Sequence, residues 1–257
     1  INKYFHRGSV NEVHSIRDLS IDIQQGDFVT IIGSNGAGKS TFLSCLAGTH
    51  ALDSGSITVA GTDVTRWPEY KRARFIGRVF QDPLMGTCAS GSIAQNLALA
   101  QKRGQRRGLT RGVKAADQEA FRERLRSLGL GLEDRLQDRA GLLSGGQRQA
   151  LTMVMATLVR PELLLLDEHT AALDPKTAAQ ILDLTKGLVA EHGLTTLMVT
   201  HNMHQALSLG NRLVMMHRGR IILDARGKEK ADLTVETLLS KFQSQADAEV
   251  SDRMLLG

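Results

Sequence analysis

The run GSNGAGKST at residues 33–41 carries the most specific chemistry in the sequence. It follows an apolar run at 28–32 that predicts a buried strand, and it precedes a pattern at 42–47 that predicts a helix with one apolar face. In such a setting, glycines let backbone N–H groups converge on an anion, and the helix start adds a positive dipole end. Lys39 would place its charge on the β- and γ-phosphates, and the Ser40 hydroxyl can ligate Mg²⁺. The run predicts a loop that binds a nucleoside triphosphate, with a plain glycine-rich turn as the alternative. Its members are Gly33, Ser34, Asn35, Gly36, Ala37, Gly38, Lys39, Ser40 and Thr41.

Asp167 and Glu168 end the fully apolar run at 163–166. Continuous hydrophobicity predicts a central parallel strand that is buried on both faces. At the carboxyl end of that strand, Asp167 can hold the Mg²⁺ shell beside the phosphate loop. Glu168 can take a proton from an attacking water if it stays ionised and within hydrogen-bond reach. Two adjacent acids in this place gain nothing from packing, which favours a chemical role.

Gln81 and His201 stand at the ends of two further predicted strands, residues 74–80 and 194–200. Because the carboxyl ends of parallel strands share one edge of the sheet, both side chains can face the same ligand. His201 could hydrogen-bond a γ-phosphate. A loop cap for Gln81 and a structural role for His201 are the alternatives. The run 201–204 lacks the acidic residue and spacing of a zinc-binding helix, so we assign no metal to it.

Ser144, Gly145 and Gly146 form a second candidate anion site. Ser144 is expected to cap a helix over 150–159, and the two glycines expose N–H groups at its positive end. One phosphate loop already holds one triphosphate. A second donor cluster therefore makes sense if it closes on a γ-phosphate held by another copy of the chain, and an ordinary capped helix is the alternative.

Three further side chains give weaker signals. Tyr4 or Phe5 can stack on a purine ring or simply pack in the core, and the residues alone leave both open. Asp174 precedes Pro175 at the expected start of another helix, where a simple capping role is one interpretation.

An α/β framework is needed to hold these groups. Residues 92–140 contain helical patterns at 93–100 and 121–128 without a strand between them, which predicts a helical subdomain inserted into the α/β core. The other expected elements are a small β region over 1–32 with turns at 7–9 and 24–27, a short strand at 55–61, a loop at 104–112, a hairpin of strands 212–216 and 220–224, and a polar tail beyond 228 with one helix at 234–242.

The composition is that of an ordinary globular protein, with 257 residues of which 42% are hydrophobic and 23% charged. No apolar run approaches the roughly eighteen residues that a membrane span needs, and no signal-peptide pattern is present. The first residue is Ile1 rather than Met, so we expect the natural first residues to be missing. The two cysteines, Cys45 and Cys88, make no disulfide framework, which suits a reducing cytosol.

The net charge is +5, and basic residues concentrate between 102 and 126. Aromatic residues are only 4% of the chain and do not interleave with this run, so base-stacking platforms are absent and no nucleic-acid partner is expected. A solvated helical face is favoured over a surface near lipid headgroups or a partner.

Together these motifs resemble those of the ABC ATPases, over nearly the whole chain. Six motifs occur in the family's order: the Walker A loop at 33–41, the Q-loop glutamine Gln81, the signature LSGGQ at Leu143, Ser144, Gly145, Gly146 and Gln147, Walker B at 163–168, the D-loop at 172–174 and the switch histidine His201. The resemblance implies a P-loop NTPase (RecA-like) fold: an α/β mixed-sheet core, an N-terminal antiparallel β subdomain and an inserted α-helical subdomain. The implied domains are residues 1–81 with 154–228 for the core, 82–153 for the helical subdomain with the signature, and 229–257 for a tail.

The resemblance also implies roles for residues. ABC ATPases work as head-to-tail dimers with two ATP molecules held between the Walker A loop of one chain and the signature of the other. The implied catalytic residues are Glu168, His201, Lys39 and Gln81, and the implied Mg²⁺ ligands are Ser40, Gln81 and Asp167. Phe5 falls where the family has its adenine-stacking aromatic residue, so it is preferred to Tyr4, and Asp174 is added to the nucleotide contacts. His169 departs from the family, in which many members have proline after the catalytic glutamate.

Residues 82–87 and 167–174 resemble most closely a group of bacterial importer ATPases. These accompany a branched-chain-amino-acid-type permease and a solute receptor, and are associated with tryptophan, tyrosine or uncharacterised solutes. The implied function is ATP hydrolysis at the cytoplasmic face of the inner membrane. The implied partners are a second copy, integral membrane permease subunits and, through the permease, an extracytoplasmic solute-binding protein. An exporter ATPase is the main alternative; a soluble ABC protein of DNA repair would need a long coiled coil that this chain lacks.

Overall fold

A six-stranded sheet forms the centre of the computed structural model, which describes residues 1–105, 112–113 and 115–244. Its strand order is β10-β9-β3-β8-β7-β6, and all neighbours are parallel except the antiparallel pair β9–β10. The strands are β3 (Phe28–Gly33), β6 (Ile76–Val79), β7 (Leu163–Asp167), β8 (Thr196–Val199), β9 (Arg212–His217) and β10 (Arg220–Arg226). The mixed sheet and the β9–β10 hairpin confirm the expected core.

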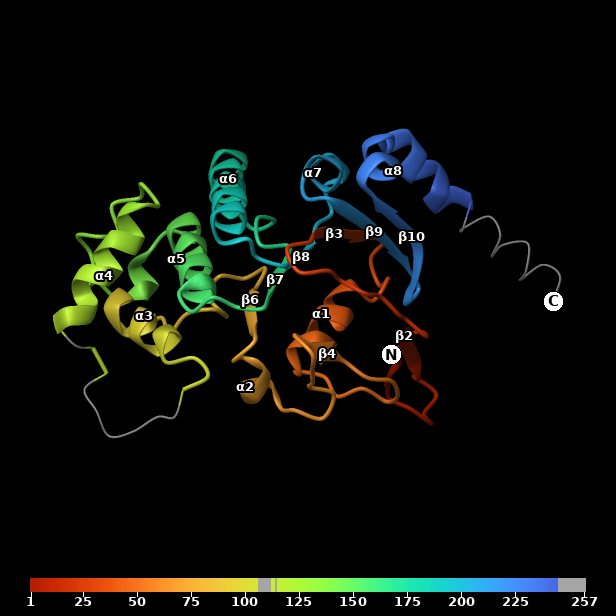
Figure 1. The fold of residues 1–257 in the computed structure, drawn as a ribbon, viewed down its shortest axis with the longest axis horizontal. Helices are drawn as coiled ribbons and strands as arrows, with labels where there is room; N and C mark the ends of the chain where they lie inside the picture. The colour runs from red at the N-terminus through yellow and green to blue at the C-terminus, as the bar shows by residue number, and fades with distance from the viewer. Residues whose placement is uncertain (106–111, 114, 245–257) are drawn as a thin grey trace.

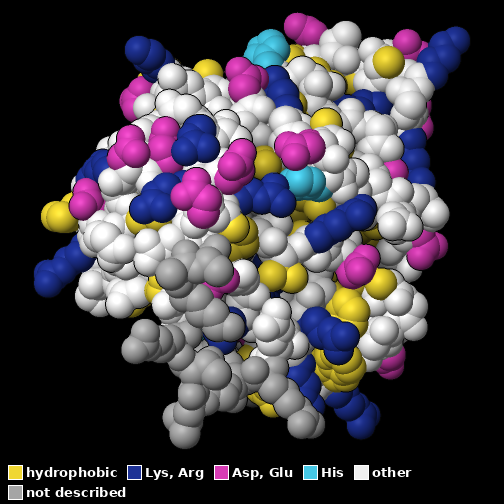
Figure 2. Space-filling view, turned by 60° about the vertical axis from the view of Figure 1, so that its left-hand side comes forward, with side chains coloured by type: hydrophobic (Ala, Val, Ile, Leu, Met, Phe, Trp, Pro, Cys, Tyr) yellow, Lys and Arg dark blue, Asp and Glu magenta, His cyan; other side chains and the backbone are white. Residues whose placement is uncertain are grey.

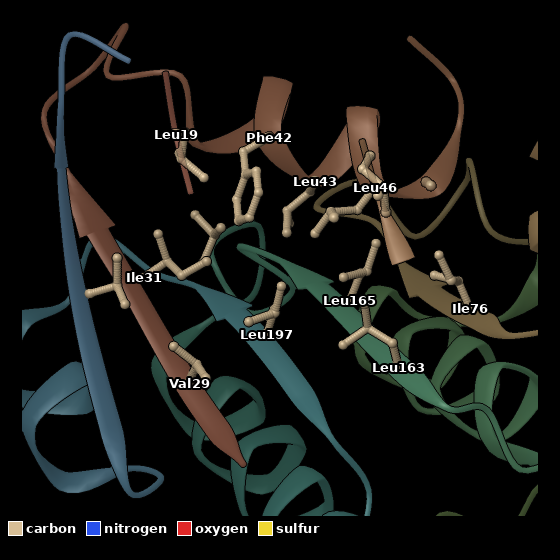
Figure 3. Close-up of a cluster of buried hydrophobic side chains, with 14 of the residues drawn as sticks. Leu19, Val29, Ile31, Phe42, Leu43, Leu46, Ile76, Leu163, Leu165 and Leu197 are labelled. Atoms are coloured by element: carbon tan, nitrogen blue, oxygen red, sulfur yellow. The ribbon is translucent and has the colours of Figure 1, made fainter. Parts of the chain in front are cut away.

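Strand β7 is buried on both faces, as its four leucines predict. Leu163 and Leu165 belong to the cluster beneath α1 (Lys39–Ala47), where they meet Phe42 and Leu43 (Figure 3). Leu164 and Leu166 point to the opposite face, into a second cluster with residues of α5 (Gly145–Thr157) and α6 (Pro175–His192). Alternate residues of a strand face opposite sides of the sheet, so a run with no polar member needs helices on both sides.

The N-terminal β region is smaller than expected. Strands β1 (Lys3–Phe5) and β2 (Val13–Ile16) pair with each other, and β4 (Thr58–Val59) pairs with β5 (Thr62–Asp63), but residues 17–27 contain no strand. Ile21 and Ile23 still pack against the cluster beneath α1. Between them, the carbonyl of Asp22 accepts from the Arg212 guanidinium at 2.5 Å instead of from a neighbouring strand. Residues 21–23 therefore alternate in burial although they pair with no neighbouring strand.

Three helices form a separate layer beside β6, built around their own apolar cluster. They are α3 (Ile93–Gln101), α4 (Ala115–Arg126) and α5. Helix α4 starts earlier than the sequence pattern suggested, and most of the loop expected at 104–112 lies outside the described residues. Glu119–Arg122 and Glu123–Arg126 form ion pairs along α4, and the space-filling view of this side shows both charge signs intermixed (Figure 2). The domain boundaries at 82 and 153 stay predictions.

The remaining helices are short, apart from α6. They are α2 (Glu69–Arg72), the 3₁₀ turn Ala140–Leu142, α7 (Met203–Ser208) and α8 (Gly227–Ala231), and residues 235–244 are also helical. The last helix agrees with the expected one at 234–242, and its Leu238 packs on Leu213 and Met215 of β9. Within the described part of the chain, none of the helices has the length and apolar composition of a membrane span.

Candidate nucleotide-binding and catalytic site

The loop between β3 and α1 is tightly enclosed by its own chain. A Cβ atom on Gly33 would lie 2.3 Å from the carbonyl oxygen of Met216, and Gly38 combines a φ of +95° with a gap of 2.5 Å to the carbonyl oxygen of Ser15. Only glycine fits either position. Helix α1 begins at Lys39, so the N–H groups of its first turn have no helical carbonyl to bond. The loop therefore presents free donors at the positive end of a helix, which is an anion site.

Lys39 is folded back onto this loop. Its side chain is 6% exposed, and Nζ donates to the carbonyl oxygens of Gly33 at 2.8 Å and Ser34 at 3.1 Å. Burial lowers the pKa of Lys39, and the nearby charges of Glu168 and Asp167 partly oppose that shift. The ammonium is thus held by two carbonyls and interacts electrostatically with two carboxylates.

Ser40 and Asp167 meet across the end of the sheet. The Ser40 hydroxyl donates to Asp167 Oδ1 at 3.1 Å, and Asp167 is 9% exposed. A hydroxyl and a carboxylate are hard oxygen ligands, and a site with few protein ligands suits Mg²⁺, which keeps most of its water. The residues present therefore fit this cation. Thr41, the last member of the predicted loop, instead accepts a hydrogen bond from Ser15 Oγ at 3.0 Å, which ties α1 to β2.

Glu168 and His201 are in direct contact. Glu168 Oε1 lies 2.6 Å from His201 Nε2, and the two side chains are 11% and 47% exposed. Glu168 follows β7 with a φ of +47°, an unusual conformation for a residue with a side chain, and its N–H donates to the carbonyl of Val199 on β8. Because β8 lies between β3 and β7, the histidine is placed between the phosphate loop and the two acids.

Two predicted residues lie near this edge without joining the contacts. Gln81 follows β6, is exposed, and makes no side-chain hydrogen bond within the described residues. Phe5 lies edge-on to His50, with 5.2 Å between ring centroids. Tyr4 stacks on His14 at 3.8 Å and carries the Arg7 guanidinium 4.9 Å from its centroid. Lys3 Nζ also lies 5.6 Å from the Phe5 centroid, so each ring contacts two groups and the choice of Phe5 for the adenine ring stays a prediction.

The signature residues open helix α5, five residues earlier than the pattern predicted. Ser144 is the N-cap: its hydroxyl accepts from the N–H of Gln147, and the Gln147 side chain accepts from the N–H of Ser144, both at 3.3 Å. The Ser144 proton remains free to be donated to an anion. Ser144 and Gly145 are exposed, whereas Leu143 is 6% exposed and packs in the helical layer's core. Gly146 faces Thr177 of α6 so closely that a Cβ would lie 2.2 Å from it.

Asp174 is the N-cap of α6. Its Oδ1 accepts from the N–H of Thr177 at 3.1 Å, and hydrogen bonds from Thr177 lower the pKa of the exposed Asp174 carboxyl. The capping role anticipated for this residue is confirmed. Its contact with nucleotide stays a prediction.

Sequence reasoning missed two residues of this region, one partly and one fully buried. Arg78 on β6 reaches Asp167 Oδ2 at 3.5 Å, and nothing in the spacing of its strand signals that contact. His169 was noticed only as a departure from a family pattern; it is 1% exposed, with Nε2 3.0 Å from Thr185 Oγ1. Thr185 donates its own proton to the carbonyl of Ile181, so the ring must donate from Nε2, and Nδ1 is left as a buried acceptor that no described residue bonds.

Comparison with known proteins places this geometry in a family. A sequence model of the ABC transporter family matches residues 16–171, more than half of the chain. The tyrosine transport ATP-binding protein of Clostridioides difficile is 47% identical over 226 residues, which are 88% of this chain and 90% of that protein. The methionine import ATP-binding protein of Vibrio vulnificus strain YJ016 is 32% identical over 86% of this chain. The chain spans only 62% of the length of that second relative.

Solved structures agree in fold. The ATP-binding cassette MJ0796, solved as a dimer in a post-hydrolysis state with ADP and Pi, has a TM-score of 0.75 and 25% identity, with 88% of this chain and 96% of that chain covered. The ADP conformation of the cassette MJ1267 has a TM-score of 0.76 and 26% identity, with 94% and 95% covered.

Proposed function

Because the chain belongs to the ABC transporter family of ATPases, we propose that two copies of it drive a membrane importer for a small solute such as an amino acid. The observation that carries this proposal is the edge of the sheet at which Lys39, the Ser40–Asp167 pair and the Glu168–His201 pair come together. A phosphate-binding loop, a metal-binding pair and a base with its partner are the parts that phosphoryl transfer to water needs.

In the proposed binding step, the triphosphate displaces Lys39 from the carbonyls of Gly33 and Ser34. Its ammonium and the N–H groups of the loop then bind the β- and γ-phosphates. Ser40 and Asp167 would hold Mg²⁺, with Gln81 as a further ligand that has to turn inward from its exposed position. The cation would supply positive charge against the phosphate oxygens. Phe5 would stack on the adenine.

In the proposed hydrolytic step, Glu168 accepts a proton from the attacking water. The water oxygen forms a bond to the γ-phosphorus while the bond to the β-γ bridging oxygen breaks, which gives ADP and phosphate. His201 orients Glu168 through the contact between Nε2 and Oε1, and its half-exposed ring can turn towards the γ-phosphate. Lys39 stabilises the charge that develops on the phosphate oxygens.

The second anion site requires a second chain. Ser144 starts α5, which packs chiefly on α6, α3 and β6, and two strands separate β6 from the strand that carries the phosphate loop. A head-to-tail pair would bring Ser144 and Gly145 of one copy onto the γ-phosphate bound by the other. Asp174, at the start of α6, would contact the same interface.

A groove of about 350 Å³ between the sheet and the helical layer would receive the permease. It lies beside Gln81 and is lined by Tyr70, Phe80, Met85 and Leu99, among others. Tyr70, Met85 and Leu99 are 73%, 69% and 53% exposed, so a partner could cover a substantial apolar surface there. The pair would lie on the cytoplasmic face of the membrane, and a solute-binding protein would act through the permease on the other side. The tyrosine transport relative makes an aromatic amino acid a reasonable first solute to test.

The test is to recover tagged protein from detergent-solubilised membranes and measure ATP hydrolysis before and after adding what co-purifies. We expect a multi-spanning permease, and turnover that rises further with a solute-loaded receptor. Met85→Asp, in the groove, should abolish recovery of the permease while the isolated chain still binds ATP; Val10→Asp, on the exposed loop between β1 and β2, is the control. A permease without receptor dependence would indicate export. Recovery of soluble partners alone would exclude a transporter.

A further inference from the structure

Arg78 is a charged side chain beneath α1, at the metal end of the proposed site. Its side chain is 13% exposed, and its guanidinium approaches Asp167 Oδ2 at 3.5 Å, Ser44 Oγ at 3.2 Å and Thr49 Oγ1 at 3.3 Å. The guanidinium also lies 4.6 Å from the centroid of the Phe80 ring. These contacts fix the charge between β6, α1 and β7.

The contact with Asp167 is electrostatic rather than a strong hydrogen bond. At 3.5 Å it is too long for a bidentate arginine–carboxylate pair, which forms at distances below about 3 Å. Both partners are nevertheless nearly buried, so solvent screens their attraction weakly. The other oxygen of Asp167 accepts from Ser40. The carboxylate proposed to hold Mg²⁺ therefore already faces a cation that belongs to the protein.

We propose that Arg78 is the internal counter-ion of Asp167, a positioning residue that makes the binding of the divalent cation depend on nucleotide. While the phosphates are absent, Arg78 balances Asp167, and Lys39 lies near both carboxylates, so a free cation finds little uncompensated negative charge. When the phosphates arrive they bring enough negative charge to outweigh Arg78, and the cation binds with them. This inference rests on the proposed function, since it assumes that Asp167 serves the metal.

The direction of the effect follows from Coulomb's law. Removing a fixed positive charge close to a cation site strengthens cation binding, while a change of shape alone does not. The measured quantity is the ADP dissociation constant in EDTA divided by the ADP dissociation constant in excess Mg²⁺. Both constants are obtained with a fluorescent ADP analogue. In Arg78→Met, which keeps an apolar contact with Phe80, this ratio should fall several-fold, because the cation then binds the nucleotide-free protein more strongly and the coupling between cation and nucleotide is reciprocal. In Arg78→Lys, which keeps the charge, it should stay near the wild-type value.

A second readout needs no nucleotide. Binding of Mn²⁺ to nucleotide-free protein, followed by electron paramagnetic resonance, should strengthen in Arg78→Met and not in Arg78→Lys. Arg103 offers a matched control because it lines the same groove and its guanidinium binds the backbone carbonyls of Ala156 and Val159, not a carboxylate. Arg103→Met should lower the melting temperature without changing the ADP ratio.

An unchanged or higher ratio in Arg78→Met would overturn the proposal, because a purely structural arginine alters both dissociation constants together. If Arg78→Met does not fold, Arg78→Gln removes the charge while keeping a donor and carries the same expectation. Failure of the proposed function gives a different result: the wild-type protein itself would then bind ADP no better with Mg²⁺ than with EDTA.

Discussion

Glu168 and His201 are the residues on which hydrolysis should depend most. Glu168→Gln keeps the size of the side chain and can still bond to His201 Nε2, but the amide cannot accept a proton from water. We expect ATP binding to persist, hydrolysis to fall roughly 10²- to 10⁴-fold, and an ATP-bound pair to accumulate. Phosphate release and size-exclusion chromatography with ATP measure both effects. Glu162→Gln, an exposed acid just before the other end of β7, is the control. Normal turnover by Glu168→Gln would rule out this base.

His169 makes the stability of the fold depend on pH. Burial lowers the pKa of His169 from 6.5 to about 4. Between pH 6.5 and about pH 4, His169 is protonated in the unfolded chain and neutral in the folded chain. The free energy of unfolding must therefore fall as the pH falls through this window. The full loss is on the order of 3 kcal/mol. Above pH 6.5 the residue has no such effect.

Urea unfolding at pH 7.5 and pH 5 measures this loss. His169→Leu removes the buried ring, so the difference in unfolding free energy between the two pH values should shrink relative to the wild type, although the variant also loses the bond to Thr185. His204→Gln changes an exposed histidine on α7 and should leave the wild-type difference intact. An equally large difference in His169→Leu would assign the pH dependence to other groups.

At the scale of an element, Ser144 at the start of α5 has two proposed roles, capping the helix and binding phosphate, and variants can separate them. Ser144 caps the helix, and in the proposed pair its hydroxyl also donates to a phosphate. Ser144→Ala should cost about 1 kcal/mol of stability and weaken ATP-driven pairing. Ser144→Asp is the sharper variant, because aspartate caps a helix as well as serine does but repels the γ-phosphate. It should keep the stability of the wild type and lose ATP-driven pairing, measured in the Glu168→Gln background.

Helix α3 supplies the matched control. Ser92 and Gln95 form the same capping box, with Ser92 Oγ accepting from the Gln95 N–H at 3.2 Å. Ser92→Ala should cost a similar stability and leave ATP-driven pairing unchanged. If Ser144→Asp still pairs with ATP as the wild type does, Ser144 is a cap and nothing more.

The start of α5 also shows what local patterns could and could not predict. The cap at Ser144 was predictable, since serine followed three residues later by glutamine is a capping box. The local pattern nevertheless predicts a helix only from 150, and Gly145 and Gly146 are poor helix formers. The reciprocal bonds of Ser144 and Gln147 and the close packing of Gly146 on Thr177 outweigh that preference. The packing of Gly146 on α6, which no local pattern contains, therefore helps to set the start of α5 at Gly145.

At the scale of the whole molecule, the sequence predicted which residues lie at the functional edge but not which of them touch. Lys39, Asp167 and His201 were expected to lie close together because each follows or ends a predicted strand, and the carboxyl ends of parallel strands lie at the same edge of a sheet. The order β3-β8-β7-β6 is set by pairing between distant segments, and only that order makes His201 the neighbour of Glu168. The contact of Arg78 with Asp167 depends on the same pairing, because β6 lies beside β7. No local pattern contains this information.

The head-to-tail pair predicts that two inactive variants restore activity to each other. Lys39→Ala disables the phosphate loop of its own copy, and Ser144→Asp disables the signature that faces the other copy's nucleotide. In a mixed pair, the intact loop of the Ser144→Asp chain faces the intact signature of the Lys39→Ala chain, so one of the two sites is complete. If subunits mix at random, half of the pairs are mixed and each has one active site, which gives about a quarter of wild-type ATP hydrolysis from an equal mixture.

Each variant alone should hydrolyse almost no ATP, and the restored rate should rise with total protein concentration because mixed pairs must form. The control mixes the Lys39→Ala chain with a chain that combines Ser144→Asp and Glu168→Gln. The only complete site of that mixed pair contains an intact loop and signature without the base, so it should form pairs and stay inactive. Absence of any recovery in the first mixture, under conditions where wild-type pairs form, would mean that each chain completes its own site and would contradict the head-to-tail pair.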